Sequence, residues 1–191
     1  MKFRNDSYYI NKVKQGDPSA YAFLVDKHKR MAYNVALQLM GNREDAQEVA
    51  QDAFLKAYQA LDGYKGESKF STWIYRIIYN AAISRLRKKK LPITSMDDEH
   101  TKVDIVGDTQ SALKSLKGEE RKRYLNAAMS QLEKDERVIL TLFYLDEKTV
   151  DEVSEITGWS SSNVKVKLHR ARKRLYSRLQ ILLKEELKMI L

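Results

Sequence analysis

Residues 149–175 read TVDEVSEITGWSSSNVKVKLHRARKRL and contain two short helical patterns that meet at Gly158. The first pattern begins with acidic residues, which suit the positive N-terminal end of a helix dipole. The second has a single apolar stripe with helical spacing. This stripe consists of Val164, Leu168, Ala171 and Leu175. A helix, a turn containing glycine and a second helix predict a helix-turn-helix, a motif that binds double-stranded DNA.

The other side of the second helix is cationic. From Lys165 to Arg178 the chain has seven Lys or Arg and no acidic residue. A solvated surface helix is the alternative, but the glycine turn favours a helix that enters the major groove. Arginine and lysine read guanine edges or neutralise phosphates, and Asn163 suits adenine or a phosphate. His169 is either part of this surface or an ordinary exposed histidine. The residues that face away from the apolar stripe are Ser162, Val166, His169, Arg170 and Lys173.

Composition limits the partners and the compartment. The 191 residues include 35 Lys and Arg against 26 Asp and Glu, a formal net charge of +9. This balance favours nucleic acid or an anionic membrane surface as partner. The absence of cysteine excludes disulfides and thiolate metal sites and suits a reducing cytoplasm. No stretch approaches the length of a bilayer span and the N-terminus lacks a signal-peptide core. We therefore expect a cytoplasmic protein without membrane insertion.

Helical periodicity extends through most of the chain, which has only seven glycines and two prolines. We predict an all-α fold of two small helical domains, residues 1–92 and 119–191, the second carrying the helix-turn-helix. The acidic stretch 93–118 has few large apolar residues, so its burial cannot offset the entropy of ordering it. It is interpreted as a flexible linker, the alternative being a helix-poor part of one domain.

Aromatic residues and a basic track occur together in residues 64–90, YKGESKFSTWIYRIIYNAAISRLRKKK. A helix is expected from about Phe70 to Lys89, with Trp73 in the core. A polar loop at residues 62–69 precedes it, and its glycines permit close backbone approach. Rings on which bases stack, beside cations that hold the backbone, suit unpaired nucleic acid, so the loop is a candidate for capturing an extruded base. The polar stripe predicted on the helix consists of Thr72, Arg76, Asn80 and Arg87.

The sequence resembles the extracytoplasmic-function sigma factors, a compact branch of the sigma-70 family of bacterial transcription initiation factors. The resemblance rests on residues 41–61, 64–90 and 156–175, in this order. It implies a protein that binds bacterial core RNA polymerase, directs it to promoter DNA and helps to open the minus-ten element. It also implies an anti-sigma factor as partner.

The resemblance assigns three sets of residues. Those implied to bind polymerase are Asp45, Glu48, Gln51, Asp52 and Phe54. Those implied to bind the minus-ten element are Tyr64, Lys65, Ser68, Lys69, Ser71, Thr72, Arg76, Asn80, Ser84, Arg87 and Lys88. Those matching positions that enter the major groove at the minus-thirty-five element are Lys165, Val166, His169 and Arg170. Val166 and His169 differ from the groups that other members carry, which leaves the preferred sequence open.

Two other classes are compatible with parts of this pattern. One is a helix-turn-helix repressor or activator that binds a palindromic operator without polymerase. The other is an enzyme acting on nucleic acid, but the three histidines are scattered and no catalytic set is visible. We therefore expect no catalytic residues, no metal and no cofactor.

Overall fold

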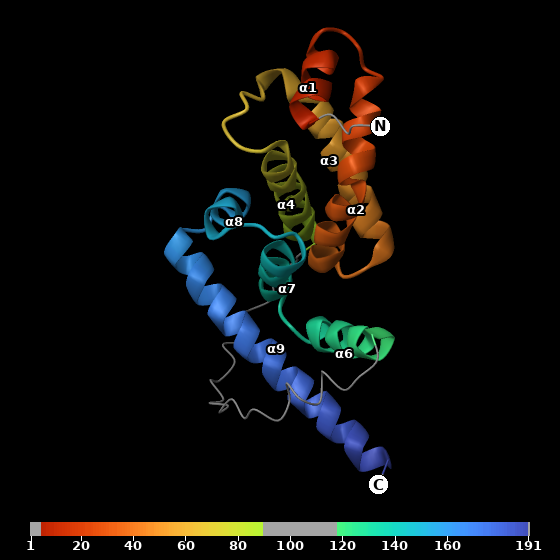
Figure 1. Cartoon of the computed structure of the whole chain (residues 1–191), viewed down its shortest axis with the longest axis vertical. Coiled ribbons are helices and arrows are strands. Elements are labelled where there is room, and N and C mark those ends of the chain that lie inside the picture. Colours follow the sequence, from red (N-terminus) through yellow and green to blue (C-terminus); the bar gives the residue numbers. More distant parts are fainter. Residues whose placement is uncertain (1–4, 90–117, 191) are drawn as a thin grey trace.

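The structure is a computed structural model that describes residues 5–89 and 118–190 (Figure 1). The predicted linker, 93–118, lies outside the described residues except for Gly118. All regular structure within the described ranges is helical, which confirms the all-α prediction. The N-terminal helices are α1 (Asp6–Lys14), α2 (Ala20–Met40), α3 (Arg43–Gln59) and α4 (Phe70–Lys89), with a 3-10 turn at Leu61–Gly63. The C-terminal helices are α6 (Gly118–Ser130), α7 (Lys134–Leu140), α8 (Val150–Thr157) and α9 (Ser161–Ile190), with a short π-helix at Thr141–Leu145.

Local sequence signals set the helix ends. Gly41 ends α2 with a left-handed backbone, φ 78°, which glycine adopts without steric cost. Asn42 then caps α3, because its side chain accepts a hydrogen bond from the Asp45 amide at 2.8 Å. At α8, Thr149 and Glu152 form a capping box. Gly158, φ 76°, ends α8 and makes the predicted turn before α9.

The N-terminal helices α2, α3 and α4 pack around an apolar core, and α1 lies against α2. The expectation that Trp73 belongs to this core is only partly met. Trp73 is half-buried at the edge of the core, whereas the fully buried residues of α4 include Ile74, Tyr75 and Ile78. The reason is that α4 is covered on two sides, by α2 and α3 on one and by α8 on the other.

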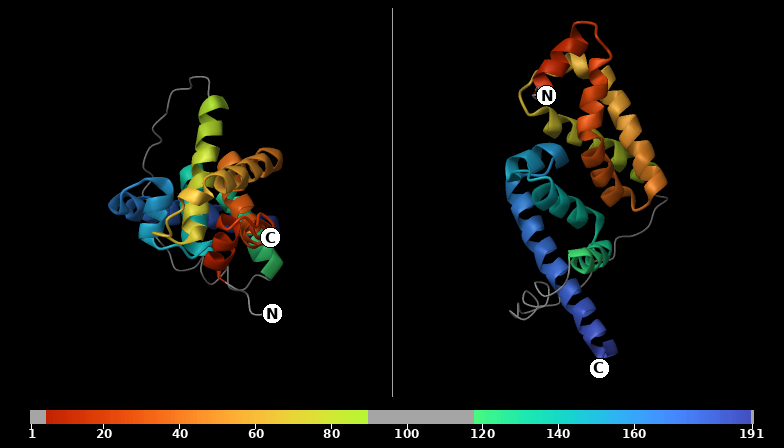
Figure 2. Two further views of the ribbon diagram at one scale, coloured as in Figure 1. Left: turned by 90° about the horizontal axis from the view of Figure 1, so that it is seen from above. Right: turned by 45° about the vertical axis from the view of Figure 1, so that its right-hand side comes forward.

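The N-terminal and C-terminal helices pack directly against one another (Figures 1 and 2). Helix α8 lies on α4, and α7 lies against α2. Arg137 of α7 donates hydrogen bonds from Nε and Nη2 to the Gln38 carbonyl oxygen, at 3.1 and 3.0 Å. Tyr79 of α4 meets Trp159 edge to face, with 6.2 Å between ring centroids. One apolar cluster therefore runs through both sets of helices. The two helical lobes predicted from the sequence pack against each other in this structure.

Candidate nucleic-acid and polymerase interfaces

The helix-turn-helix presents one face of α9 to solvent. Val164, Leu168 and Ala171 are buried against α7 and α8, as the predicted stripe requires. The opposite face exposes Ser162, Asn163, Lys165, Val166, His169 and Arg170, and Lys173 is half-buried. The structure thus brings the predicted duplex-binding residues together at the surface.

Two cationic side chains of α9 form ion pairs with acidic residues of the same chain. Lys167 lies 3.0 Å from Asp135 and 4.5 Å from the centroid of the Trp159 ring. Arg174 pairs with Glu133 at 3.2 Å and with Glu136 at 3.0 Å. These contacts orient α9 on α7. The cationic face therefore divides into residues that hold the helix in place and residues, such as Lys165 and Arg170, that point to solvent.

Helix α4 carries a stripe of exposed polar side chains. Its exposed members are Arg76, Asn80, Ser84, Arg87 and Lys88. Asn80 and Ser84 line a shallow hollow of about 290 Å³ together with Lys56 and Ile77. Lys56 belongs to α3, whereas the predicted stripe lies on α4. Periodicity within α4 therefore could not indicate Lys56 as a member of this site.

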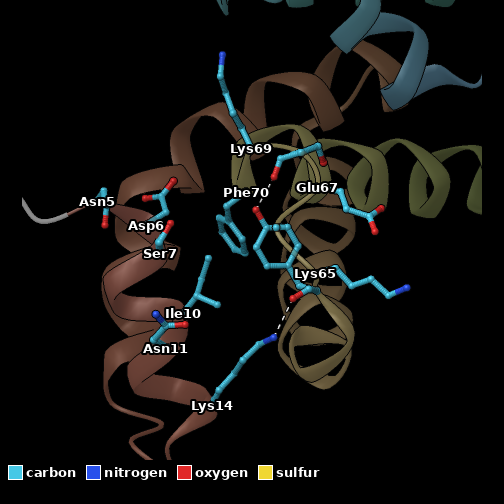
Figure 3. Close-up of a pocket in the computed structure, with 13 residues that line it drawn as sticks. Asn5, Asp6, Ser7, Ile10, Asn11, Lys14, Lys65, Glu67, Lys69 and Phe70 are labelled. Carbon is cyan, nitrogen blue, oxygen red and sulfur yellow. Dashed lines mark hydrogen bonds between the residues drawn. The ribbon is translucent and has the colours of Figure 1, made fainter.

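A larger cavity, about 640 Å³, lies between α1 and the loop that precedes α4 (Figure 3). The loop side contains the predicted residues Tyr64, Lys65, Ser68 and Lys69. Tyr64 donates a hydrogen bond to the Ser68 carbonyl at 2.5 Å, which closes the loop on itself. Its ring contacts those of Phe70 and Trp73, and burial raises the pKa of its hydroxyl group. The other wall is α1, which the sequence did not indicate.

Helix α8 and the loop before it contact part of the predicted minus-ten set. Thr72 is completely buried and donates a hydrogen bond to Glu152 at 3.3 Å. Ser71 accepts one from Lys148 at 3.0 Å, and burial lowers the pKa of that lysine. Lys69 pairs with Glu152 at 3.1 Å. Thr72 was predicted to share a polar stripe with Arg76, but in this structure its side chain is buried, because α8 packs against the start of α4.

The acidic face of α3 is only partly as predicted. Gln51 and Asp52 are exposed. Asp45 and Glu48 contact the guanidinium group of Arg85 in α4, at 3.0 and 2.5 Å. Phe54 is 8% exposed and belongs to the core, so its assignment to a docking surface is wrong.

One apolar residue of α3 was missed. Leu55 is 57% exposed and follows Asp52 by one helical turn. The sequence carries a signal for it, since Leu55 lies outside the apolar stripe that contains Ala53 and Ala57. Leu55 therefore adds an apolar side chain to the exposed side of α3 that carries Gln51 and Asp52.

Neither a metal site nor a membrane-spanning helix is evident in residues 5–89 and 118–190. No three His, Asp or Glu side chains of residues 5–89 and 118–190 gather as a metal would require. None of the described helices is both long and apolar enough to cross a bilayer.

Two family models match the chain, one over the N-terminal helices and one over the C-terminal helices. Residues 24–91 match Sigma-70 region 2, and residues 122–175 match Sigma-70, region 4. These two regions on one helical chain define a sigma-70 type transcription initiation factor.

Relatives narrow the class. The chain is 34% identical to the ECF RNA polymerase sigma factor SigW of Bacillus subtilis, over 90% of this chain and 95% of that one. It is 30% identical to the RNA polymerase sigma-H factor of Pseudomonas aeruginosa, over 94% and 96%. It is 27% identical to the ECF RNA polymerase sigma-E factor of Escherichia coli K12, over 94% and 96%. The chain belongs to the extracytoplasmic-function (ECF) sigma factors.

Solved structures share the fold. CnrH in complex with the cytosolic domain of CnrY matches with a TM-score of 0.63 at 20% identity, over 92% of this chain and 97% of that one. RpoE in complex with the anti-sigma factor NepR from Bartonella quintana matches with a TM-score of 0.61 at 21% identity, over 84% and 97%. At these identities the likeness concerns the arrangement of helices.

Proposed function

We propose that this ECF sigma factor binds core RNA polymerase in the cytoplasm, directs it to specific promoters and stabilises the opened minus-ten element. The chain supplies binding surfaces, and the polymerase supplies the chemistry of RNA synthesis. The observation that carries the proposal is the sorting of cations on α9. Lys167 and Arg174 are paired internally, while Lys165 and Arg170 face solvent beside Asn163. Such a face suits phosphates and base edges of a duplex.

The N-terminal domain, residues 1–92, is proposed to bind the minus-ten element with two surfaces. The stripe from Arg76 to Lys88 on α4 is open to the duplex edge, and the cavity beside Tyr64 is open to an extruded base. An extruded base costs a few kcal/mol to unstack, so a pocket with several polar groups is needed to hold it. The polar wall of the cavity and its aromatic floor, Tyr64 and Phe70, meet that need.

The second domain, residues 119–191, is proposed to bind the minus-thirty-five element. Duplex upstream and single strand downstream would then be held by separate domains joined through 93–118. For Thr72 to reach DNA, α8 must leave α4, and the hydrogen bond of Ser71 to Lys148, in the loop before α8, must break. We therefore propose that the closed arrangement opens when the factor joins polymerase. An anti-sigma factor is proposed as a further partner, supported by the family and by the solved complex of RpoE with NepR.

Docking on polymerase is proposed for the exposed side of α3, at Gln51, Asp52 and Leu55. Acidic residues on a basic protein favour a basic protein surface over nucleic acid.

In vitro transcription with bacterial core polymerase and a library of promoter fragments tests the function. Initiation that depends on the added chain, at promoters sharing two spaced elements, is the expected result. Tight binding of a palindromic duplex by the chain alone, with no effect on initiation, would instead identify a repressor.

A further inference from the structure

Helix α1 precedes the part of the chain that matches Sigma-70 region 2, which begins at residue 24. Nevertheless α1 supplies one complete wall of the cavity beside the minus-ten loop (Figure 3). The side chains that line it from α1 and its cap Asn5 are polar or charged apart from Ile10, and they include Asp6, Ser7, Asn11 and Lys14. The opposite wall is the loop from Tyr64 to Phe70. The geometry therefore brings an unassigned helix against the site that the proposed function uses.

The C-terminal end of α1 is bonded to the start of the loop. The Lys14 ammonium group donates to the Asp62 carbonyl oxygen at 3.1 Å and to the Tyr64 carbonyl oxygen at 2.8 Å. Both carbonyls belong to the backbone where the 3-10 turn passes into the loop. A charged donor shared by two carbonyls fixes the direction in which the chain leaves the turn. Lys14 thus fixes the backbone at Tyr64, and the backbone in turn positions the Tyr64 ring.

The N-terminal end of α1 is bonded near the end of the same loop. The Asp6 carboxylate lies 3.1 Å from His28 Nε2 and 2.7 Å from Lys27 Nζ. The His28 ring packs on Phe70, the first residue of α4, with 5.4 Å between centroids. Hydrogen bonding to His28 and Lys27 outweighs burial and lowers the pKa of Asp6 to about 2. Helix α1 is therefore attached beside both ends of the loop, which are eight residues apart in sequence.

We propose that α1 is a structural part of the minus-ten site. Lys14 is a positioning residue that sets the loop for an extruded base, and Asn11 offers an amide to that base from the opposite wall. Asn11 is exposed and lines the cavity, and its amide carries both a donor and an acceptor. This proposal rests on the proposed function and adds to it residues that lie outside the region 2 match. The ligand is one unpaired nucleobase of the non-template strand.

The test uses full-length factor bound to core polymerase and a promoter recovered by the transcription experiment. A minus-ten non-template strand carrying 2-aminopurine reports base capture. Lys14→Met should weaken strand binding roughly tenfold, because two hydrogen bonds from a charged donor to the loop are lost. Lys14→Arg, which keeps a cationic donor, should recover part of this loss. Lys12→Met removes the same charge from the same turn of α1 and should change binding less than twofold.

A second variant keeps the proposal testable if Lys14→Met weakens the whole bundle. Within residues 5–89 and 118–190 the Asn11 side chain makes no intramolecular hydrogen bond. The Asn11→Ala change should therefore weaken strand binding several-fold and leave the free energy of unfolding unchanged. Duplex binding by α9 should be unaffected in every variant. Wild-type strand binding by both Lys14→Met and Asn11→Ala would overturn the role of α1. Failure of the unmodified factor to capture any base would instead overturn the proposed function.

Discussion

Thr72 of α4 donates a hydrogen bond to Glu152 of α8, so the helix proposed for the minus-ten element is joined to the helix-turn-helix. Glu152 also pairs with Lys69 and completes the capping box of its own helix through Thr149. One carboxylate therefore serves three roles. Its position adds polar contacts to the apolar packing that joins the two sets of helices, and it offers a point at which they can be separated.

Glu152→Gln should favour the open arrangement of the two domains. Glutamine still closes the capping box, because Gln serves as well as Glu at that position. The charge that holds Lys69 is lost. Because Lys69 is 75% exposed, the pair contributes only about 0.5 kcal/mol, so the ratio of open to closed molecules should roughly double. Energy transfer between dyes on α3 and α9 measures this ratio, and the chain has no native cysteine to interfere with labelling.

Glu155→Gln is the matched control, since it removes the same charge from an exposed position of α8. It should leave energy transfer unchanged. Added salt should open the unmodified protein and should have less effect on Glu152→Gln, because screening acts on the pair that this variant lacks. Equal responses to salt in both proteins would show that the pair does not contribute to closure.

Arg170→Ala should relax sequence preference at one position of the minus-thirty-five element. A guanidinium group that reads a base contributes about 1–3 kcal/mol, and its loss should affect cognate duplex more than mismatched duplex. Arg174→Ala is the contrast within the same helix, because Arg174 pairs with Glu133 and Glu136. That variant should lower the free energy of unfolding and leave base preference intact. Uniform weakening by Arg170→Ala on every duplex would identify a phosphate contact instead.

The elements that sequence predicts well here have strong local signals. The boundaries of α4 agree with the expected helix from Phe70 to Lys89, and the stripe from Val164 to Ala171 is buried. Both depend on helical periodicity, which a stretch of sequence carries by itself. The turn at Gly158 was predictable for the same reason, since a left-handed backbone favours glycine.

The errors arise where packing between distant segments decides burial. Thr72 looks like a member of a polar stripe, but α8, eighty residues later, covers it. Phe54 is assigned to polymerase by the resemblance, yet its side chain lies in the core of the N-terminal helices. The wall that α1 contributes to the cavity depends on Lys14 reaching across to Asp62, a contact between residues 48 positions apart. Periodicity within one helix contains no information about such partners.

Asp52→Lys should weaken binding to core polymerase without weakening duplex binding. Asp52 is exposed on α3 beside Leu55, where a basic partner surface would meet it. Reversal of one rim charge should lower the association rate several-fold and make it less sensitive to salt. Asp26→Lys, on the exposed side of α2, makes the same change in net charge. Stopped-flow association with labelled core polymerase compares the two variants. Equal association rates for Asp52→Lys and Asp26→Lys would show that the docking surface does not include Asp52.

Asp6→Asn should destabilise the protein at neutral pH and progressively less in acid. Because the folded-state pKa of Asp6 is about 2, against an ordinary 3.8, its carboxylate stabilises the fold above the ordinary value, and this is lost as pH falls toward 2. A shift of this size corresponds to about 2 kcal/mol. Urea unfolding of both proteins from pH 6 to pH 3 should therefore give a difference that narrows toward acid. Asp52→Asn, which removes the same charge from an exposed position of α3, is the control for the loss of one carboxylate. A difference that stays constant with pH would mean that Asp6 acts through packing, and that the attachment of α1 to His28 does not depend on charge.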